Sequence, residues 1–69
     1  MNMNIPALTT DAIQALHSLI SQCLECDDAL PAGAEKHYGV RQYPDWREES
    51  NQLETELDRR KIPYTKIAW

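Results

Sequence analysis

The sequence predicts an all-α fold: an antiparallel hairpin of two helices, over about residues 10–30 and 45–61, with a long loop between them and an extended C-terminal tail. Three observations lead to this prediction. Apolar residues recur at helical spacing in the first half of the chain, a second set of helix-start signals follows the loop, and proline or glycine comes after each helix. With 69 residues, the chain is expected to form a single domain over 1–69.

The first predicted helix begins at two threonines. Thr9 and Thr10 supply hydroxyls that cap helices, and Asp11 places a carboxylate in the first turn, where the helix dipole favours negative charge. Pro31 and Gly33 mark the end of the helix. Between these limits an apolar seam follows a heptad spacing, which is typical of a helix that packs along one face. The seam is Ile13, Leu16, Ile20, Cys23, Asp27 and Leu30, and Ala12, Leu19 and Leu24 widen it.

The second predicted helix begins at Asp45, which we expect to be the N-cap, with Glu48 three residues later in a variant of the capping box. Cationic residues gather at its other end, where they complement the dipole, and Pro63 stops the helix near Lys61. The apolar stripe of this helix is narrow and consists of Trp46, Leu53 and Leu57.

The two predicted helices therefore do not match in apolar surface. One hairpin seam cannot cover the broad face of the first helix, so the C-terminal tail, a second copy of the chain or another protein has to cover the rest. We favour a homodimer packed largely on the first helix. The residues expected in the core or the dimer contact are Ile13, Leu16, Leu19, Ile20, Cys23, Leu24, Leu53 and Leu57. In the alternative, the tail folds back and closes the core with Ile62, Tyr64, Ile67 and Trp69. A short pairing of residues 38–43 with this tail also stays open.

Charge is unevenly distributed along the chain, whose net charge is -4. Residues 1–35 hold five acids and no Lys or Arg, whereas residues 36–69 hold seven bases and six acids. An acidic surface repels nucleic acid and attracts basic protein surfaces. Glu25, Asp27 and Asp28 are candidates for an acidic ridge that contacts such a partner. Asp27 falls within the apolar seam, where an unpaired buried carboxylate would be costly. Two structural alternatives to partner contact therefore stay open: the side chain is solvated at the helix end, or it is paired with a base of the second helix.

The loop and the start of the second helix carry the second candidate partner-binding surface. Its members are Tyr38, Arg41, Tyr43 and Trp46. Tyrosine, tryptophan and arginine are the residues most enriched at energetically important interface positions. The same aromatic residues would also serve as a plug at the end of the hairpin. Tyr38 is the residue that we most expect to contact a partner.

Residues that carry chemistry are few. Cys23 and Cys26 form a lone CxxC inside a helix, and only His17 and His37 exist to complete a metal site. We therefore expect no metal, no cofactor and no enzymatic activity. A basic cluster, Arg59, Arg60 and Lys61, suggests as an alternative function a small nucleic-acid-binding or transcription-regulating module.

The stretch YGVRQYPDWR (residues 38–47), followed by residues 53–60 and by Ile62, Pro63 and Tyr64, resembles a family of small proteins of Mu-like temperate phages of pseudomonads, the phage-encoded quorum-sensing anti-activators. The resemblance covers essentially the whole chain, and the short length also matches.

This resemblance implies a dimeric, mostly helical inhibitor that acts in the host bacterial cytoplasm. Such a protein binds the DNA-binding domain of a LuxR-type quorum-sensing activator (LasR) and prevents it from binding DNA. It also implies inhibition of the type IV pilus assembly ATPase (PilB), which leads to superinfection exclusion. The absence of a visible secretory signal or membrane-length apolar run agrees with the expected location.

Overall fold

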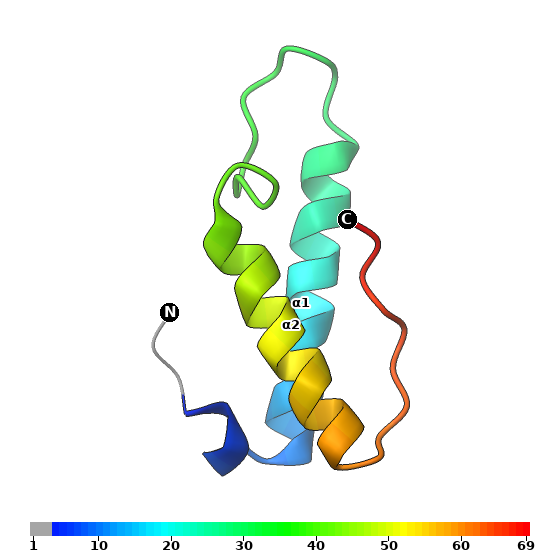
Figure 1. The fold of residues 1–69 in the computed structure, drawn as a ribbon. Coiled ribbons are helices and arrows are strands. Elements are labelled where there is room, and N and C mark those ends of the chain that lie inside the picture. The colour runs from blue at the N-terminus through cyan, green and yellow to red at the C-terminus, as the bar shows by residue number, and fades with distance from the viewer. Residues whose placement is uncertain (1–3) are drawn as a thin grey trace.

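The computed structural model describes residues 4–69. A short 3-10 helix, η1 (Ile5–Ala7), precedes the two main helices, α1 (Thr10–Asp28) and α2 (Pro44–Arg59). In Figure 1 the chain rises through α1 and descends through α2, which crosses α1 obliquely. The described residues contain no strand, so the predicted all-helical class, with two main helices in contact, is confirmed.

Helix α1 begins at the predicted residue. Thr9 is the N-cap, and its hydroxyl accepts a hydrogen bond from the Ala12 N–H over 3.1 Å. The helix ends at Asp28, two residues before the predicted end at residue 30. The Leu30 N–H already bonds to the carbonyl three residues back, over 3.2 Å, so the last turn tightens ahead of Pro31, which disfavours a helical conformation in the residue before it.

Helix α2 begins differently from the prediction. Its N-cap is Tyr43, which makes no side-chain cap, and Pro44 is the first helical residue. The expected capping box of Asp45 and Glu48 is therefore wrong. Proline fits the first helical position because its φ is preset and the N–H that it lacks would have had no partner within the helix. Asp45 instead lies in the first turn, where the helix dipole stabilises its negative charge.

The end of α2 is made by a non-glycine residue in a left-handed conformation. The helix ends at Arg59, two residues before the predicted residue 61, and Lys61 has a φ of 59°. The Ile62 N–H then donates to the Leu57 carbonyl over 3.0 Å, as in the Schellman motif that closes many helices. Pro63 follows and directs the chain into the tail.

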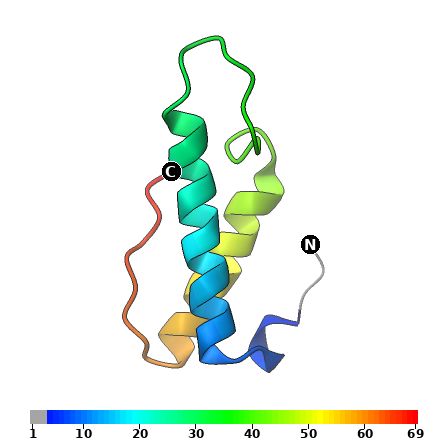
Figure 2. The same ribbon diagram turned by 180° about the vertical axis from the view of Figure 1, so that it is seen from behind.

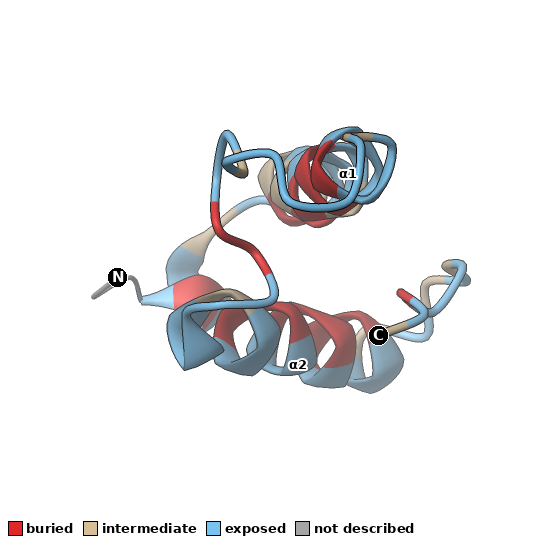
Figure 3. Cartoon of the chain, turned by 90° about the horizontal axis from the view of Figure 1, so that it is seen from above, coloured by how far each residue is buried: buried red, intermediate tan, exposed pale blue. Residues whose placement is uncertain are grey.

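The core lies between the two helices, whose buried parts face each other in Figure 3. Of the residues expected there, Ile13, Ile20, Cys23, Leu24, Leu53 and Leu57 are buried, and Leu16 is half-buried. Leu19 is 52% exposed, so it lies outside the core of the single chain and stays a candidate for the dimer contact. The loop contributes Val40 and η1 contributes Ile5, so the connecting segments also enter the core.

The C-terminal tail folds back along the helix pair, as Figures 1 and 2 show. Ile67 is buried, while Ile62, Tyr64 and Trp69 pack against the core from the outside. The fold-back alternative is thus the arrangement found in the single chain. Strand pairing between residues 38–43 and the tail does not occur in the described residues; the two segments meet where the Arg41 guanidinium donates to the main-chain oxygen of Trp69.

Arg60 clamps the end of α2 to the start of the chain. Its guanidinium donates to the Leu8 carbonyl over 2.7 Å, to the Pro6 carbonyl over 3.2 Å and to the Thr10 hydroxyl over 3.0 Å. It also donates to the buried Glu56 carboxylate over 2.6 Å, and Arg59 bonds the same carboxylate from the solvent side. The hydrogen bonds from Arg59 and then from Arg60 lower the pKa of Glu56 from 4.5 to about 2.

This clamp makes stability depend on pH in the acid range. Because the pKa of Glu56 is lower in the folded chain than its ordinary value, its contribution is complete above pH 4.5 and is lost as the pH falls toward about 2. Arg60→Ala is expected to lower the melting temperature at neutral pH and to flatten its decline between those two pH values. Thermal melts followed by circular dichroism measure both effects.

Arg59→Ala is the matched variant, because it removes an arginine bond to Glu56 but none to residues 6–10. It should flatten the acid decline and lower the melting temperature at neutral pH by a corresponding amount, but less than Arg60→Ala, which also loses the bonds to residues 6–10. Equal melting temperatures for wild type and Arg60→Ala at neutral pH would contradict the clamp.

Candidate functional site

The carboxylate of Asp27 organises the loop after α1. The side chain is 2% exposed, and its oxygens accept hydrogen bonds from three backbone N–H groups. His37 and Tyr38 donate to Oδ1, each over 3.1 Å, and Val40 donates to Oδ2 over 3.0 Å. Lys36 bonds the Asp27 carbonyl over 2.8 Å. Burial alone would raise the pKa of Asp27, but the N–H donors outweigh it and hold that pKa below 3.8.

This geometry decides between the interpretations of Asp27 that the sequence left open. The carboxylate is neither solvated nor paired with a base of α2, and it is not part of an exposed ridge. Its removal from the candidate partner-binding residues is a correction. The physical reason is that the loop supplies enough donors to bury a charge, which would otherwise be costly.

We call residues 36–43 the aromatic loop. Gly39 has a φ of 66°, and a Cβ built there would lie 2.7 Å from the Tyr43 ring, so glycine is required both by the backbone and by the neighbouring side chain. The Gly39 carbonyl accepts the N–H groups of Gln42 and Tyr43, each over 3.0 Å. The loop is therefore closed at both ends, by Asp27 and by its own turn.

Aromatic side chains extend from this fixed backbone. Tyr38 is 46% exposed and Tyr43 is 61% exposed. Trp46 is half-buried, packs on the core and meets the Tyr38 ring edge-on with centroids 6.5 Å apart. Trp46 thus acts as the plug at the end of the helix pair, while the two tyrosines form a surface. The plug interpretation therefore fits Trp46, and contact of the exposed tyrosines with a partner stays a prediction.

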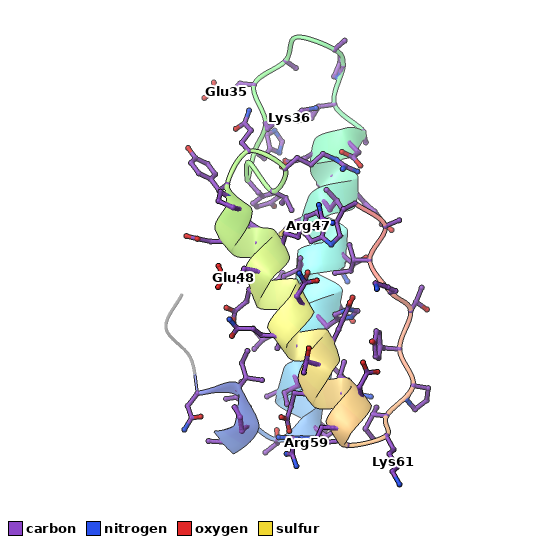
Figure 4. The ribbon with its side chains drawn as sticks, viewed as in Figure 1. Glu35, Lys36, Arg47, Glu48, Arg59 and Lys61 are labelled. Atoms are coloured by element: carbon purple, nitrogen blue, oxygen red, sulfur yellow. The ribbon has the colours of Figure 1, made fainter. Side chains whose placement is uncertain are left out.

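The remaining candidates lie around this surface. Arg41 forms a two-point ion pair with the exposed Asp28 carboxylate, over 2.9 and 3.0 Å, and this pair ties the loop to the end of α1. Glu25 is exposed on α1. Figure 4 shows Lys36, at the start of the aromatic loop, near one end of the molecule, and Arg59 and Lys61 of the basic cluster at the other end.

Sequence reasoning missed a buried pair in the middle of the fold. His17 and Glu54 are both buried and bond over 2.9 Å. Glu54 also accepts the Ile67 N–H over 3.2 Å, and the Tyr64 ring packs edge-on against His17. The pair thereby fastens the tail to both helices. The spacing of apolar residues could have predicted that His17 is buried, because it lies one turn from Ile13 and one turn from Ile20 on the buried face of α1.

The two cysteines and one histidine lie on α1, and the other histidine lies in the aromatic loop. No cluster of three or more metal-ligating side chains occurs within residues 4–69. Both cysteines are free, and burial, followed by the nearby Cys26 and Asp27, raises the pKa of the Cys23 thiol. None of the described helices is long and apolar enough to cross a bilayer.

Comparison of the chain with models of protein families, with curated proteins and with solved structures finds no match.

The role of Asp27 is tested by Asp27→Asn. An amide has one acceptor oxygen in place of two, so the N–H groups of residues 37, 38 and 40 cannot all remain bonded. Hydrogen exchange at these three amides should accelerate strongly, while exchange in the middle of α1 and α2 stays slow. Because the pKa of Asp27 is lowered on folding, the same loosening is expected in the wild type as the pH falls below 3.8.

Asp28→Asn is the control, since it removes the neighbouring charge and an exposed ion pair of the kind that contributes little. It should leave exchange at those three amides almost unchanged. Slow exchange in Asp27→Asn would show that another interaction holds the loop.

Proposed function

We propose that this protein is a non-enzymatic inhibitor that binds the basic DNA-binding domain of a LuxR-type quorum-sensing activator (LasR) and prevents it from binding DNA. The observation that carries the proposal is the aromatic loop: a buried carboxylate fixes its backbone while Tyr38 and Tyr43 remain exposed. A chain that orders exposed tyrosines in this way has a surface suited to binding another protein.

Preorganisation supports this interpretation. Ordering a loop during binding costs free energy, and a loop that is already fixed avoids much of that cost. The Asp27 bonds and the Gly39 turn fix the loop before any partner arrives. Tyrosine adds a large, fairly rigid contact area with a polar tip.

Charge favours a basic target. Of the acids on α1, Asp27 is buried and Asp28 is paired with Arg41, so the exposed carboxylates of Asp11 and Glu25 give this side of the molecule its negative field. DNA-binding surfaces are basic because they neutralise phosphates, so an acidic protein on such a surface competes with DNA directly. The resemblance to the phage anti-activators points to the same class of target.

The alternative of a nucleic-acid-binding module is less well supported. Arg60 is occupied by the clamp to residues 6–10, and Arg59 is bound to Glu56. Lys61 remains exposed, but acidic side chains surround the end of α2. The basic cluster therefore serves mainly to close the fold.

We further propose a homodimer formed through the uncovered face of α1. An uncharged stripe on this face includes Leu19, and each of its members is exposed or half-buried in the single chain: Ala12, Ala15, Leu16, Leu19 and Cys26. Positions 12, 16, 19 and 26, with the buried Cys23 between them, follow a heptad spacing, which packs well against an identical seam. A symmetric pair would cover Leu19 with its own equivalent.

The inhibitor proposal is tested by an electrophoretic mobility-shift assay with the purified activator domain, its target DNA and this protein. Wild-type protein should remove the shifted band, with greater effect at low salt. Tyr38→Ala should weaken inhibition by about tenfold or more, as expected for a central interface side chain. Gln14→Ala, at an exposed position of α1, is the control. Persistence of the shifted band at saturating wild-type protein would refute the proposal.

The shape of the loop is tested by Gly39→Ala in the same assay. The variant forces a side chain into a left-handed conformation and against the Tyr43 ring, so inhibition should fall about as far as with Tyr38→Ala. Gly33→Ala is the matched control: its φ is 84°, but a Cβ there meets nothing within 4 Å. Equal inhibition by Gly39→Ala and Gly33→Ala would mean that the conformation of the aromatic loop does not matter for inhibition.

The pilus assembly ATPase, the second target that the resemblance implies, offers a further assay for the same variants.

The dimer is tested by sedimentation or by light scattering. Leu19→Glu should convert the protein to a monomer, because it places a charge in an apolar seam. Gln14→Glu adds the same charge outside the stripe and should leave the dimer intact. A monomeric wild type would refute the dimer without affecting the inhibitor proposal.

A further inference from the structure

The first two turns of α2 carry a small acidic hollow that none of the preceding roles uses. Asp45, Glu48, Glu49 and Gln52 line a space of about 100 Å³. We call these four residues the acidic cup. They are spaced three and four residues apart, so they share one side of the helix. The cup begins two residues after Tyr43 and therefore adjoins the aromatic loop.

Glu49 distinguishes this cup from an ordinary acidic helix surface. The residue is only 5% exposed. Its Oε1 atom is buried, yet this atom has no hydrogen-bond partner among the described residues. A buried carboxylate oxygen without a partner is costly, and native proteins seldom contain one without a reason. The other buried acids, Asp27, Glu54 and Glu56, all have donors from this chain.

The cup also lacks a counter-charge. Among the described residues, the ion pairs join His17 to Glu54, Arg41 to Asp28, and Arg59 and Arg60 to Glu56, and none of them involves the cup. Arg47 is the nearest base in sequence, but its guanidinium lies over the Trp69 ring, 6.0 Å from the centroid. Figure 4 shows Arg47 and Glu48 on different sides of α2. Carboxylates one turn apart repel each other, so the cup favours an external cation.

From this arrangement we propose that the acidic cup is a binding site for one arginine side chain of the partner protein. A guanidinium presents several N–H donors in a plane, which suits two or three carboxylates and the Gln52 amide oxygen at once. A wider hollow shares the lining residues Glu48 and Gln52 with the cup and is also lined by Ile5 and Pro6, beside which the aliphatic stem of an arginine would pack.

This inference rests on the proposed function for the identity of the partner, but the cup is testable without it. The probe is N-acetyl-arginine amide, titrated into isotope-labelled protein and followed by NMR. Saturable shifts should be confined to residues 45–52 and their neighbours, and Glu49→Gln should abolish them. N-acetyl-citrulline amide has nearly the same shape without the charge and should cause no such shifts. Absence of saturation with the arginine probe, or equal shifts with citrulline, would overturn the inference.

Stability separates a binding role of Glu49 from a structural one. Since Glu49 has no partner to lose among the described residues, Glu49→Gln should melt at or above the wild-type temperature. Glu35→Gln removes one exposed charge from the loop and is the matched control. A clear loss of stability in Glu49→Gln alone would assign the residue to the fold and overturn the inference.

The mobility-shift assay then tests the site in its proposed context. Glu49→Gln should weaken inhibition by about tenfold, the effect expected when one charge-assisted contact is lost, whereas Glu35→Gln should not. If wild type and Glu49→Gln inhibit equally, the cup is not part of the interface although the proposed function stands. If the wild type itself does not inhibit, the proposed function fails and the arginine titration alone decides whether the cup binds a cation.

Discussion

The bonds between the Asp27 carboxylate and the backbone of the following loop are the interaction on which the candidate surface depends. A buried charge needs strong donors, and here the N–H groups of His37, Tyr38 and Val40 provide them. These bonds hold the loop over the end of α1, and Val40 lies in the core. With the backbone fixed, Tyr38 meets Trp46 and Tyr43 remains outside. One carboxylate thus links the end of a helix, the core and an exposed aromatic surface.

Buried acids have a similar role elsewhere in this small fold. Glu54 fastens the tail to the helices through His17 and the Ile67 N–H, and Glu56 joins Arg60 in holding the start of the chain. A chain of 69 residues has a modest apolar core, and such chains commonly rely on disulfides, metals or a second subunit. Here Asp27 and Glu54 tie the loop and the tail to the helix pair through bonds between residues distant in sequence, and Glu56 holds the Arg60 guanidinium that bonds residues 6–10. Part of the acidic charge is therefore structural, and the remainder is available to a partner.

The proposed surfaces fit together in space. The aromatic loop and the acidic cup are adjacent because Tyr43 and Asp45 lie on either side of Pro44, so one basic partner would contact both. The apolar stripe belongs to α1, on residues that neither surface uses. A symmetric pair through that stripe would present two loops and two cups, and linked binding sites raise the strength of attachment without new contacts. In this proposal the dimer seam and the partner surface occupy separate parts of the chain.

The sequence by itself determined the features that depend on near neighbours. The cap at Thr9, the periodic apolar residues of α1, the helix end before Pro31 and the aromatic composition of the loop were all readable from local patterns. The local pattern misled at Asp45, because Pro44 occupies the first helical position and leaves the cap to Tyr43. Tertiary structure decided the environment of Asp27, the burial of His17 with Glu54, the fold-back of the tail and the exposure of Leu19. The physical reason is that Asp27 and Glu54 bind backbone N–H groups distant in sequence, and every residue except proline offers the same donor. Residue type therefore carries no sign of which segment will supply that bond, and only the folded arrangement of the chain selects it.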